Sequence, residues 1–195
     1  MEGFADDVHR AADALERTER ERDRAITESR RIIRLSKRTI HAIHTGEDPS
    51  DVASELQDAM DGLMSSVDPD VLHTQVIADA AMEFAEAMIL KGIVQEGRVP
   101  SAEELGIQPS SWVLGLGDSI GELRRLVTSC LMDGDMEGAN RHFSVMEEIS
   151  GEFMQLDVPD AVAPVRRKQD IARGIMDRTR SDMTTASIMD RVGKL

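Results

Sequence analysis

The chain has 195 residues, of which 41% are hydrophobic and 31% are charged, so it can bury a sizeable core and is neither collagen-like nor wholly disordered. With a single cysteine, no signal-peptide pattern and no long apolar run, we expect a cytoplasmic protein that has no internal disulfide and no membrane segment. The net charge of −14 repels a polyanion on average, so nucleic-acid binding would require a local basic patch or a metal ion.

The sequence predicts helices throughout, because no stretch shows the alternating pattern of a strand. Four phenylalanines, one tryptophan and no tyrosine also disfavour an aromatic platform for stacking bases. Glycines and prolines divide the chain into predicted helices over about 5–45, 50–65, 70–96, 110–132, 136–155 and 160–188. We expect one all-α domain over 1–195, a single-domain helical bundle with a long N-terminal helix and mobile ends over 1–20 and 189–195.

The first predicted helix has an apolar side. Four isoleucines and two small serines fall on one face at 100° per residue: Ile26, Ile33, Ile40, Ile43, Ser29 and Ser36. This spacing predicts a seam against which a neighbouring helix packs closely.

The opposite side of the same helix carries a basic stripe. Its members follow one another at helical spacing and are Arg30, Arg34, Lys37, Arg38 and His41, with Arg31 at the edge. No acid interrupts the run from Arg30 to Arg38, so the stripe could hold a phosphate backbone. The alternative is that these cations pair with acids on a neighbouring helix or subunit.

Two of the predicted helices carry acidic residues among mostly apolar ones. Glu83 and Glu86 interrupt a nearly all-apolar helix at i,i+3, with Asp79 one turn earlier. Asp118 and Glu122 lie at i,i+4 on a helix whose glycines at 115, 117 and 121 let another backbone come near. Because a buried carboxylate needs a partner, the two pairs could together bind Mg²⁺ or Mn²⁺, which prefer oxygen ligands.

Arginines offer these acids a different partner. Arg125 shares the stripe of Asp118 and Glu122, and Arg124 lies beside it, so the acids could serve only in ion pairs. Spacing alone leaves both interpretations open.

Other motifs predict little chemistry. His41 and His44 could ligate zinc, but no H-E-x-x-H pattern or cysteine supports them. Cys130 lies among apolar residues and is expected to be a structural thiol. Ser101 followed by Glu104 predicts a capped turn.

Four segments, in a fixed order over about residues 20–188, resemble the translin family, and within it translin-associated factor X and its archaeal relatives. They are Ser29–His44, Met82–Ala87, Val113–Arg125 and Arg167–Arg173. The resemblance implies an all-α bundle whose subunits form hollow, usually octameric shells that take in single-stranded RNA or DNA. In the branch that resembles translin-associated factor X, clustered acids bind Mg²⁺ and cleave RNA.

The acids of that branch match Glu83, Glu86, Asp118 and Glu122. Translin proper carries an apolar residue where Asp118 stands here, so this chain resembles the catalytic branch. It departs from that branch in having no tyrosine, with Phe84 as the aromatic after the first acid, and in having Ala85 where a branched residue is common.

Our leading hypothesis is therefore a metal-dependent endoribonuclease that acts on single-stranded RNA inside a homo-oligomeric shell. The four acids would hold Mg²⁺, or Mn²⁺, and carry the catalysis. The nucleic-acid-binding residues would be Arg30, Arg34, Lys37, Arg38, His41, Arg124 and Arg125. One alternative is a non-catalytic shell that binds single-stranded RNA or DNA, and another is a helical interaction module that binds no nucleic acid.

Overall fold

The computed structural model describes residues 3–66 and 74–193, and this part of the chain contains helices and no strand. The elements are α1 (Phe4–Thr45), α2 (Ser50–Ser66), α4 (Gln75–Lys91), the π-helical turn η1 (Gly92–Glu96), α5 (Pro109–Met132), α6 (Met136–Phe153) and α7 (Val165–Gly193). The predicted all-α fold with a long first helix is confirmed. None of the described helices is long and apolar enough to cross a membrane.

Most predicted helix limits lie close to the observed ones, but the last helix was predicted to start too early. It begins at Val165 rather than near 160, and it extends past 188 to Gly193. The residue before a proline is pushed out of the helical region, so the chain can enter a helix only after Pro164. Before that point the chain turns, with the Val162 N–H bonded to the Pro159 carbonyl at 2.8 Å. Positions 70–73 of the third predicted helix lie outside the described residues.

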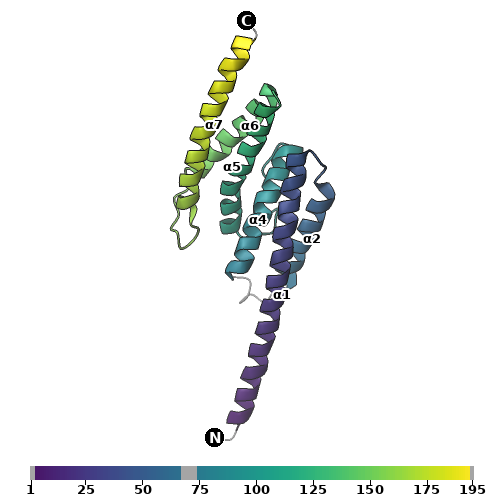
Figure 1. The fold of residues 1–195 in the computed structure, drawn as a ribbon. Coiled ribbons are helices and arrows are strands. Elements are labelled where there is room, and N and C mark those ends of the chain that lie inside the picture. Colours follow the sequence, from purple (N-terminus) through teal and green to yellow (C-terminus); the bar gives the residue numbers. More distant parts are fainter. Residues whose placement is uncertain (1–2, 67–73, 194–195) are drawn as a thin grey trace.

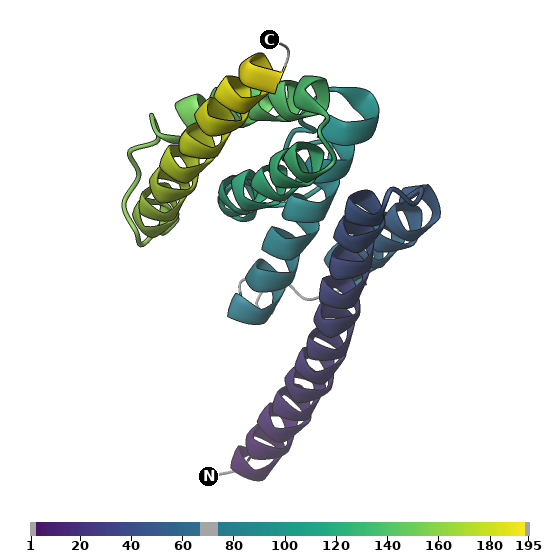
Figure 2. The same cartoon turned by 45° about the horizontal axis from the view of Figure 1, so that its top comes forward.

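The helices form an elongated bundle whose centre is α4 and α5 (Figure 1). α1 and α2 make a hairpin, joined at Gly46, whose left-handed φ of 74° suits glycine. α4 packs between α1 and α5, and α5 packs in turn against α6 and α7. The second view places α1 and α7 on opposite sides of the central pair (Figure 2). A side chain that needs neighbours from α1 and α7 together must therefore lie near α4 and α5.

The core follows this arrangement. The largest fully buried side chains come from every helix but α7, and they include Ile32, Leu56, Phe84, Ile120 and Phe153. Burying each such side chain contributes roughly 1.5–3 kcal/mol. The apolar character of α4 and α5 is thus explained by their central position.

The glycines of α5 have different neighbours. Gly115 is the point at which α5 approaches the backbone of α4, as the sequence predicts. Gly117 faces the ring of Phe153, where an added Cβ would come within 2.7 Å of the ring. Gly121 has more room, since its nearest neighbour would be Ile175 Cδ1 at 3.9 Å.

The apolar side of α1 is used within the chain. Ile40 and Ile43 are buried, and Ile26 and Ile33 are half-buried. Ser29 and Ser36 are buried and small enough for close packing, and the Ser36 hydroxyl donates to the carbonyl of Ile32 at 3.0 Å. The predicted seam therefore belongs largely to the subunit core. The N-terminal part of α1, before Ala25, projects beyond the bundle (Figure 1).

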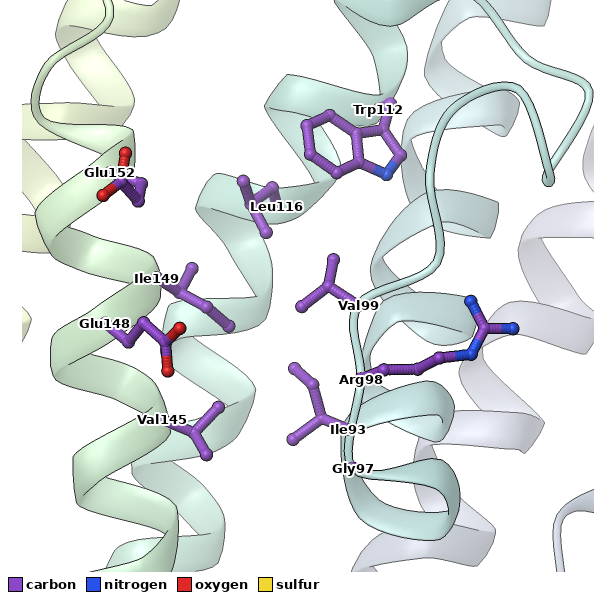
Figure 3. Close-up of a pocket in the computed structure, with 10 residues that line it drawn as sticks. All are labelled: Ile93, Gly97, Arg98, Val99, Trp112, Leu116, Val145, Glu148, Ile149 and Glu152. Atoms are coloured by element: carbon purple, nitrogen blue, oxygen red, sulfur yellow. The ribbon is translucent and has the colours of Figure 1, made fainter.

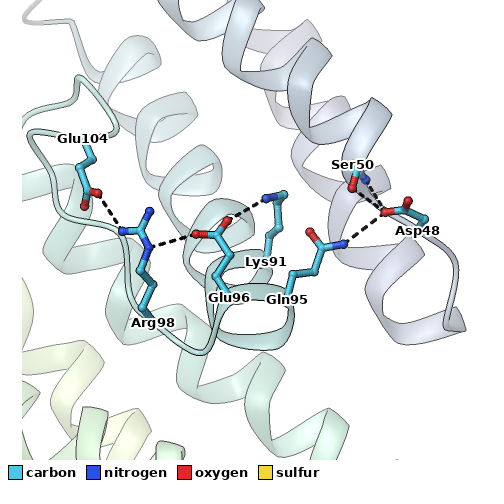
Figure 4. A network of polar contacts seen from close by, with 7 residues as sticks. All are labelled: Asp48, Ser50, Lys91, Gln95, Glu96, Arg98 and Glu104. Atoms are coloured by element: carbon cyan, nitrogen blue, oxygen red, sulfur yellow. Dashed lines mark hydrogen bonds and ion pairs between the residues drawn. The ribbon is translucent and has the colours of Figure 1, made fainter.

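A polar network fixes the loop that follows η1 (Figure 4). The Ser101 N–H donates to the Glu104 carboxylate at 2.7 Å, and the Glu104 N–H donates to the Ser101 hydroxyl at 3.1 Å. This reciprocal pair is a capping box, so the predicted cap is confirmed. Arg98 then joins Glu104 to Glu96, and Lys91 also bonds Glu96. The loop is thereby tied to the end of α4.

Candidate functional site

The fold brings acids from α4 and α5 to one pocket of about 280 Å³. Side chains from α1, α4 and α5 line it: Lys37, Ile40, His41, Glu83, Glu86, Glu122 and Arg125. Asp118 lies one turn before Glu122 on α5, close enough for its charge to act on Glu86. The structure thus places the four predicted acids in one neighbourhood. It also places the end of the basic stripe beside them.

Glu86 is the most perturbed group of the site. Burial raises the pKa of its carboxyl to about 8, helped by the charges of Asp118, Glu122 and Glu83, while Lys168 acts in the opposite direction. Neither Glu86 nor Glu83 makes a hydrogen bond or ion pair with any residue of the described part of the chain. At neutral pH, Glu86 therefore holds a proton, and a nearby cation would favour its ionised form.

The two acids of α5 are held by bases from three helices. Asp118 forms an ion pair with Lys168 of α7. Glu122 Oε2 lies 2.5 Å from His44 Nε2 of α1 and accepts a hydrogen bond from Arg125 Nη1 at 2.8 Å. Burial alone would raise the pKa of Glu122, but the contacts with His44 and Arg125 outweigh it and lower the pKa. Glu122 is thus an ionised carboxylate with two basic partners, whereas Glu86 is protonated and has no hydrogen-bond partner in the described part of the chain.

Arg124 is not part of the pocket, contrary to the sequence interpretation. Its guanidinium donates to Thr179 and to Asp182 of α7, each at 2.8 Å. Two residues along a helix differ by about 200° in direction, so Arg124 points away from Glu122 while Arg125 at i+3 points toward it. Arg125 alone fulfils the expectation of an arginine beside the α5 acids.

Asp79 is also separate from the site. It is exposed and accepts a hydrogen bond from Gln75 at 2.6 Å, one turn away on α4. The acidic face of α4 that matters is therefore limited to Glu83 and Glu86.

Two side chains of the pocket offer oxygen donors of the kind that hard divalent cations prefer. Within residues 3–66 and 74–193, no three His, Cys, Asp or Glu side chains form a ready-made metal-binding group. Mg²⁺ does not require one, because it usually keeps several waters and binds through one or two carboxylates together with substrate phosphate. The unpaired carboxyl groups of Glu83 and Glu86, both facing the pocket, supply oxygen donors of this kind.

The basic stripe is exposed and leads to the pocket. Arg30, Arg34, Lys37 and Arg38 form no ion pair with the residues that the structure describes, whereas Arg31 pairs with Glu55 at 2.9 Å. From Arg30 to His41 the stripe covers roughly 16 Å at 1.5 Å per residue. Two members of its C-terminal half, Lys37 and His41, line the pocket. A chain of phosphates bound along α1 would therefore reach the acids.

Sequence reasoning did not assign Lys168 or His44 to the acids. Lys168 lies 50 positions from Asp118 and His44 lies 78 positions from Glu122, so helical spacing could not relate them. The zinc interpretation had joined His44 to His41, but His41 is exposed and His44 contacts Glu122. The only earlier signal for Lys168 was its place in the last segment of the family resemblance.

Cys130 has no activating surroundings. It is half-buried, and burial raises the pKa of its thiol, with Asp135 and Asp133 acting in the same direction. A thiol that stays protonated is a poor nucleophile, which agrees with the structural role expected from the sequence.

A second pocket lies elsewhere, between η1, α5 and α6, and is mostly apolar (Figure 3). It measures about 340 Å³, and Trp112, Leu116 and Ile149 project into it. Glu148 and Glu152 lie at its α6 side. It contains none of the acids or bases predicted from the sequence, so the candidate chemistry stays with the acidic pocket.

Comparison with known proteins agrees with this fold. No model of a known protein family matches the chain. The chain is 31% identical over 167 residues to the uncharacterized protein MJ0175 of Methanocaldococcus jannaschii, covering 84% of this chain and 75% of that protein.

Three solved structures are similar over almost the whole chain. The crystal structure of AfC3PO has a TM-score of 0.87 with 27% identity, and the AfC3PO complex with duplex RNA has a TM-score of 0.86 with 26% identity. Each comparison covers 93% of this chain and 97% of the other. The structure of apo-NeC3PO has a TM-score of 0.80 with 22% identity, and the match covers 95% of this chain and 98% of the other. At this identity the similarity shows the fold alone. With the relative from M. jannaschii and these C3PO proteins, the chain belongs to the translin family.

Proposed function

We propose that this protein is a metal-dependent endoribonuclease that cleaves single-stranded RNA inside a homo-oligomeric shell. The observation that carries the proposal is the meeting of two features at one pocket. Acids from α4 and α5 gather there, and the unpaired basic stripe of α1 ends there. A phosphate backbone and a divalent cation are the two ligands that these features suit.

The acids divide into two kinds in this proposal. Glu83 and Glu86 are unpaired and would serve as ligands of Mg²⁺, or of Mn²⁺, while Asp118 and Glu122 would add negative charge around the ion. Bound metal supplies polarisation of the scissile phosphate and an acidified water molecule. Glu86 gives up its proton when the ion binds, because a coordinating carboxylate must be ionised.

The bases bind and orient the RNA. Arg30, Arg34 and Arg38 hold successive phosphates along α1, and Lys37 with His41 directs the backbone into the pocket. Arg125 at the pocket wall offsets charge that develops on the phosphate. The duplex RNA bound in the AfC3PO complex supports RNA as the ligand class.

The shell is proposed on the family resemblance and on an exposed apolar stripe. Phe4, Val8 and Leu15 follow at helical spacing on the projecting part of α1 and are 62%, 49% and 71% exposed. A helix segment of this length is marginal in water without packing partners. A neighbouring subunit of the same kind, in an octamer or a related assembly, would cover it.

A second candidate is a non-catalytic shell that binds RNA or single-stranded DNA. The observation in its favour is that Asp118 and Glu122 already have basic partners in Lys168, His44 and Arg125. In that case the acids would only stabilise the junction of α1, α4, α5 and α7.

The test is incubation of the purified protein with labelled single-stranded RNA, a duplex of the same sequence and the matching single-stranded DNA, each with Mg²⁺ or with EDTA. Cleavage of single-stranded RNA only with Mg²⁺ supports the endoribonuclease. A gel shift without cleavage supports the binding shell. Neither cleavage nor shift would contradict both and leave an interaction module that binds no nucleic acid.

A further inference from the structure

Lys168 is held at the acidic site by the packing of α7 on α5. It lies in the first turn of α7, between Val165 and Ala172, which are buried. Its side chain is 19% exposed and its ammonium pairs with Asp118, whose side chain is 33% exposed. The neighbouring Arg167 is exposed. Lys168 is therefore directed toward the acids, whereas Arg167, the residue before it, remains exposed to water.

Within the described part of the chain, Lys168 is the ion-pair partner of the α5 acid that His44 and Arg125 do not hold. Glu83 and Glu86 have no basic partner in the described part of the chain, and Glu122 is already bonded to His44 and Arg125. Asp118 would add a further unpaired negative charge to the cluster if Lys168 were absent. The charge of Lys168 reaches beyond Asp118, since it acts on Glu86 as well.

We propose that Lys168 neutralises the acidic site in the metal-free protein and competes with the divalent cation for Asp118. This inference rests on the proposed function, because it takes the acidic pocket as the metal site. Lysine suits the role better than arginine would. Its ammonium is a compact point charge on a flexible stem, so it can release a carboxylate without disturbing the helix that carries it. Lys168 thereby stabilises the fold without metal and weakens metal binding.

The test measures Mn²⁺ binding to the assembled protein without RNA, by the electron paramagnetic resonance signal of the free ion. Two variants remove the charge, Lys168→Met and Lys168→Gln, and the second keeps a hydrogen-bond donor for Asp118 if the first folds poorly. Lys168→Arg keeps the charge, and Arg167→Met removes one charge from the adjacent exposed position.

We expect Lys168→Met and Lys168→Gln to bind Mn²⁺ about tenfold more tightly than the unaltered protein, the order expected when one charge-assisted contact that competes with the ion is removed. Their melting temperatures in EDTA should fall, and added Mn²⁺ should raise them by more than it raises that of the unaltered protein. Arg167→Met should leave the Mn²⁺ affinity unchanged, and Lys168→Arg, which keeps the competing charge, should not increase it. A residue that only supported the structure would lower the melting temperature without tightening metal binding.

Equal or weaker Mn²⁺ binding in both uncharged variants, or no binding by any of the proteins, would overturn the inference. Equal tightening in Arg167→Met would also overturn it, because the effect would then come from net charge. RNA cleavage by the unaltered protein is measured separately, so that failure of the nuclease proposal can be told from failure of the competition. Tighter Mn²⁺ binding in the Lys168 variants without any cleavage would contradict the nuclease and leave the competition standing.

Discussion

Gly115 of α5 lies so close to Ala85 of α4 that a Cβ atom at position 115 would come within 2.6 Å of the Ala85 Cβ. The same atom would be 2.7 Å from the Met82 carbonyl oxygen and 2.9 Å from the Glu86 backbone nitrogen. Because these are backbone and Cβ atoms, no side-chain rotation can relieve the contact. The approach of the two helices sets the separation of the acid pairs, since Glu86 and Asp118 both lie within one turn of it.

Gly115→Ala should therefore push α4 and α5 apart. We expect a loss of roughly 1–3 kcal/mol of stability, as for other overpacked positions. RNA cleavage should fall further than stability explains, because a displacement of the acids near 1 Å can cost about a hundredfold in rate. Thermal unfolding and the cleavage rate of the folded variant check this.

Gly121→Ala is the control on the same helix. Its new Cβ would meet Ile175 Cδ1 at an ordinary 3.9 Å, so helix propensity should dominate and stability should stay equal or rise slightly. Equal behaviour of the two variants would show that the close approach does not position the acids.

The helices could be predicted from the sequence because their signals are local. Glycine and proline mark the breaks, and the apolar faces of α4 and α5 show that both are buried. The sequence predicted a close backbone approach at Gly115, Gly117 and Gly121, but in the described part of the chain only Gly115 has one, since Gly117 faces the ring of Phe153 and Gly121 faces Ile175. The start of α7 was predicted too early, because Pro164 keeps the residue before it out of the helical region and the chain turns before that point.

The acids could be selected from the sequence, but their partners could not. Carboxylates on buried helices stand out whatever lies opposite them. The contacts of Asp118 with Lys168 and of Glu122 with His44 depend on how α7 and α1 pack on α5, which no spacing within one helix reveals. The raised pKa of Glu86 likewise results from its burial and from the charges of four side chains on three helices. Such properties arise only in the assembled fold.

The pKa of Glu86 makes the metal-free protein sensitive to pH. Its carboxyl has a pKa of about 8 in the folded chain against an ordinary 4.5, so the folded state keeps a proton that the unfolded state has lost between these values. Stability in EDTA should therefore fall as the pH rises from 4.5 to about 8, by up to about 1.4 kcal/mol per unit of pKa shift. Denaturant unfolding at several pH values measures this.

Glu86→Gln cannot ionise and should flatten that dependence in EDTA. Mg²⁺ must displace the proton from Glu86, so its affinity for the unaltered protein should rise with pH up to about 8 and then level off. A pH dependence of stability that is the same in both proteins would mean that Glu86 does not titrate in this range.

The basic stripe should govern RNA affinity without base preference. Arg34→Ala together with Arg38→Ala should weaken binding of all single-stranded RNA sequences alike and reduce the salt dependence of binding, because two phosphate contacts are lost. Filter binding over a range of salt concentrations measures both quantities. Replacing Arg141 and Arg180, which pair with Glu137 and Glu147, removes the same charge elsewhere and should have a much smaller effect. Equal losses in the two double variants would assign the effect to net charge.

Assembly should depend on the projecting part of α1. Leu15→Glu places a charge on the exposed apolar stripe and should reduce the particle from several times the mass of one chain to smaller species, as light scattering would show. Met132→Glu, at an 88% exposed position at the end of α5, is the control and should leave the assembly intact. An unaltered protein that is a monomer at micromolar concentration would contradict the shell itself.

The enzyme proposal depends on two isosteric changes, Asp118→Asn and Glu86→Gln, with Asp79→Asn as an exposed control on α4. If the acids bind metal, both changes should lower RNA cleavage by orders of magnitude while the shell and RNA binding survive. RNA affinity should even rise in Asp118→Asn, because a carboxylate that repels phosphate is gone. Asp79→Asn should cleave normally.

If the acids are only structural, the two changes should act in opposite directions. Asp118→Asn would leave the half-buried ammonium of Lys168 without its ion pair and lower the melting temperature. Glu86→Gln breaks no ion pair and replaces a carboxyl that is already protonated at neutral pH, so the variant should be at least as stable as the unaltered protein. Cleavage rate, melting temperature and particle mass measured on both variants therefore separate the accounts. Inactive Glu86→Gln in an intact, stable shell supports the metal site, and full activity of both variants would refute it.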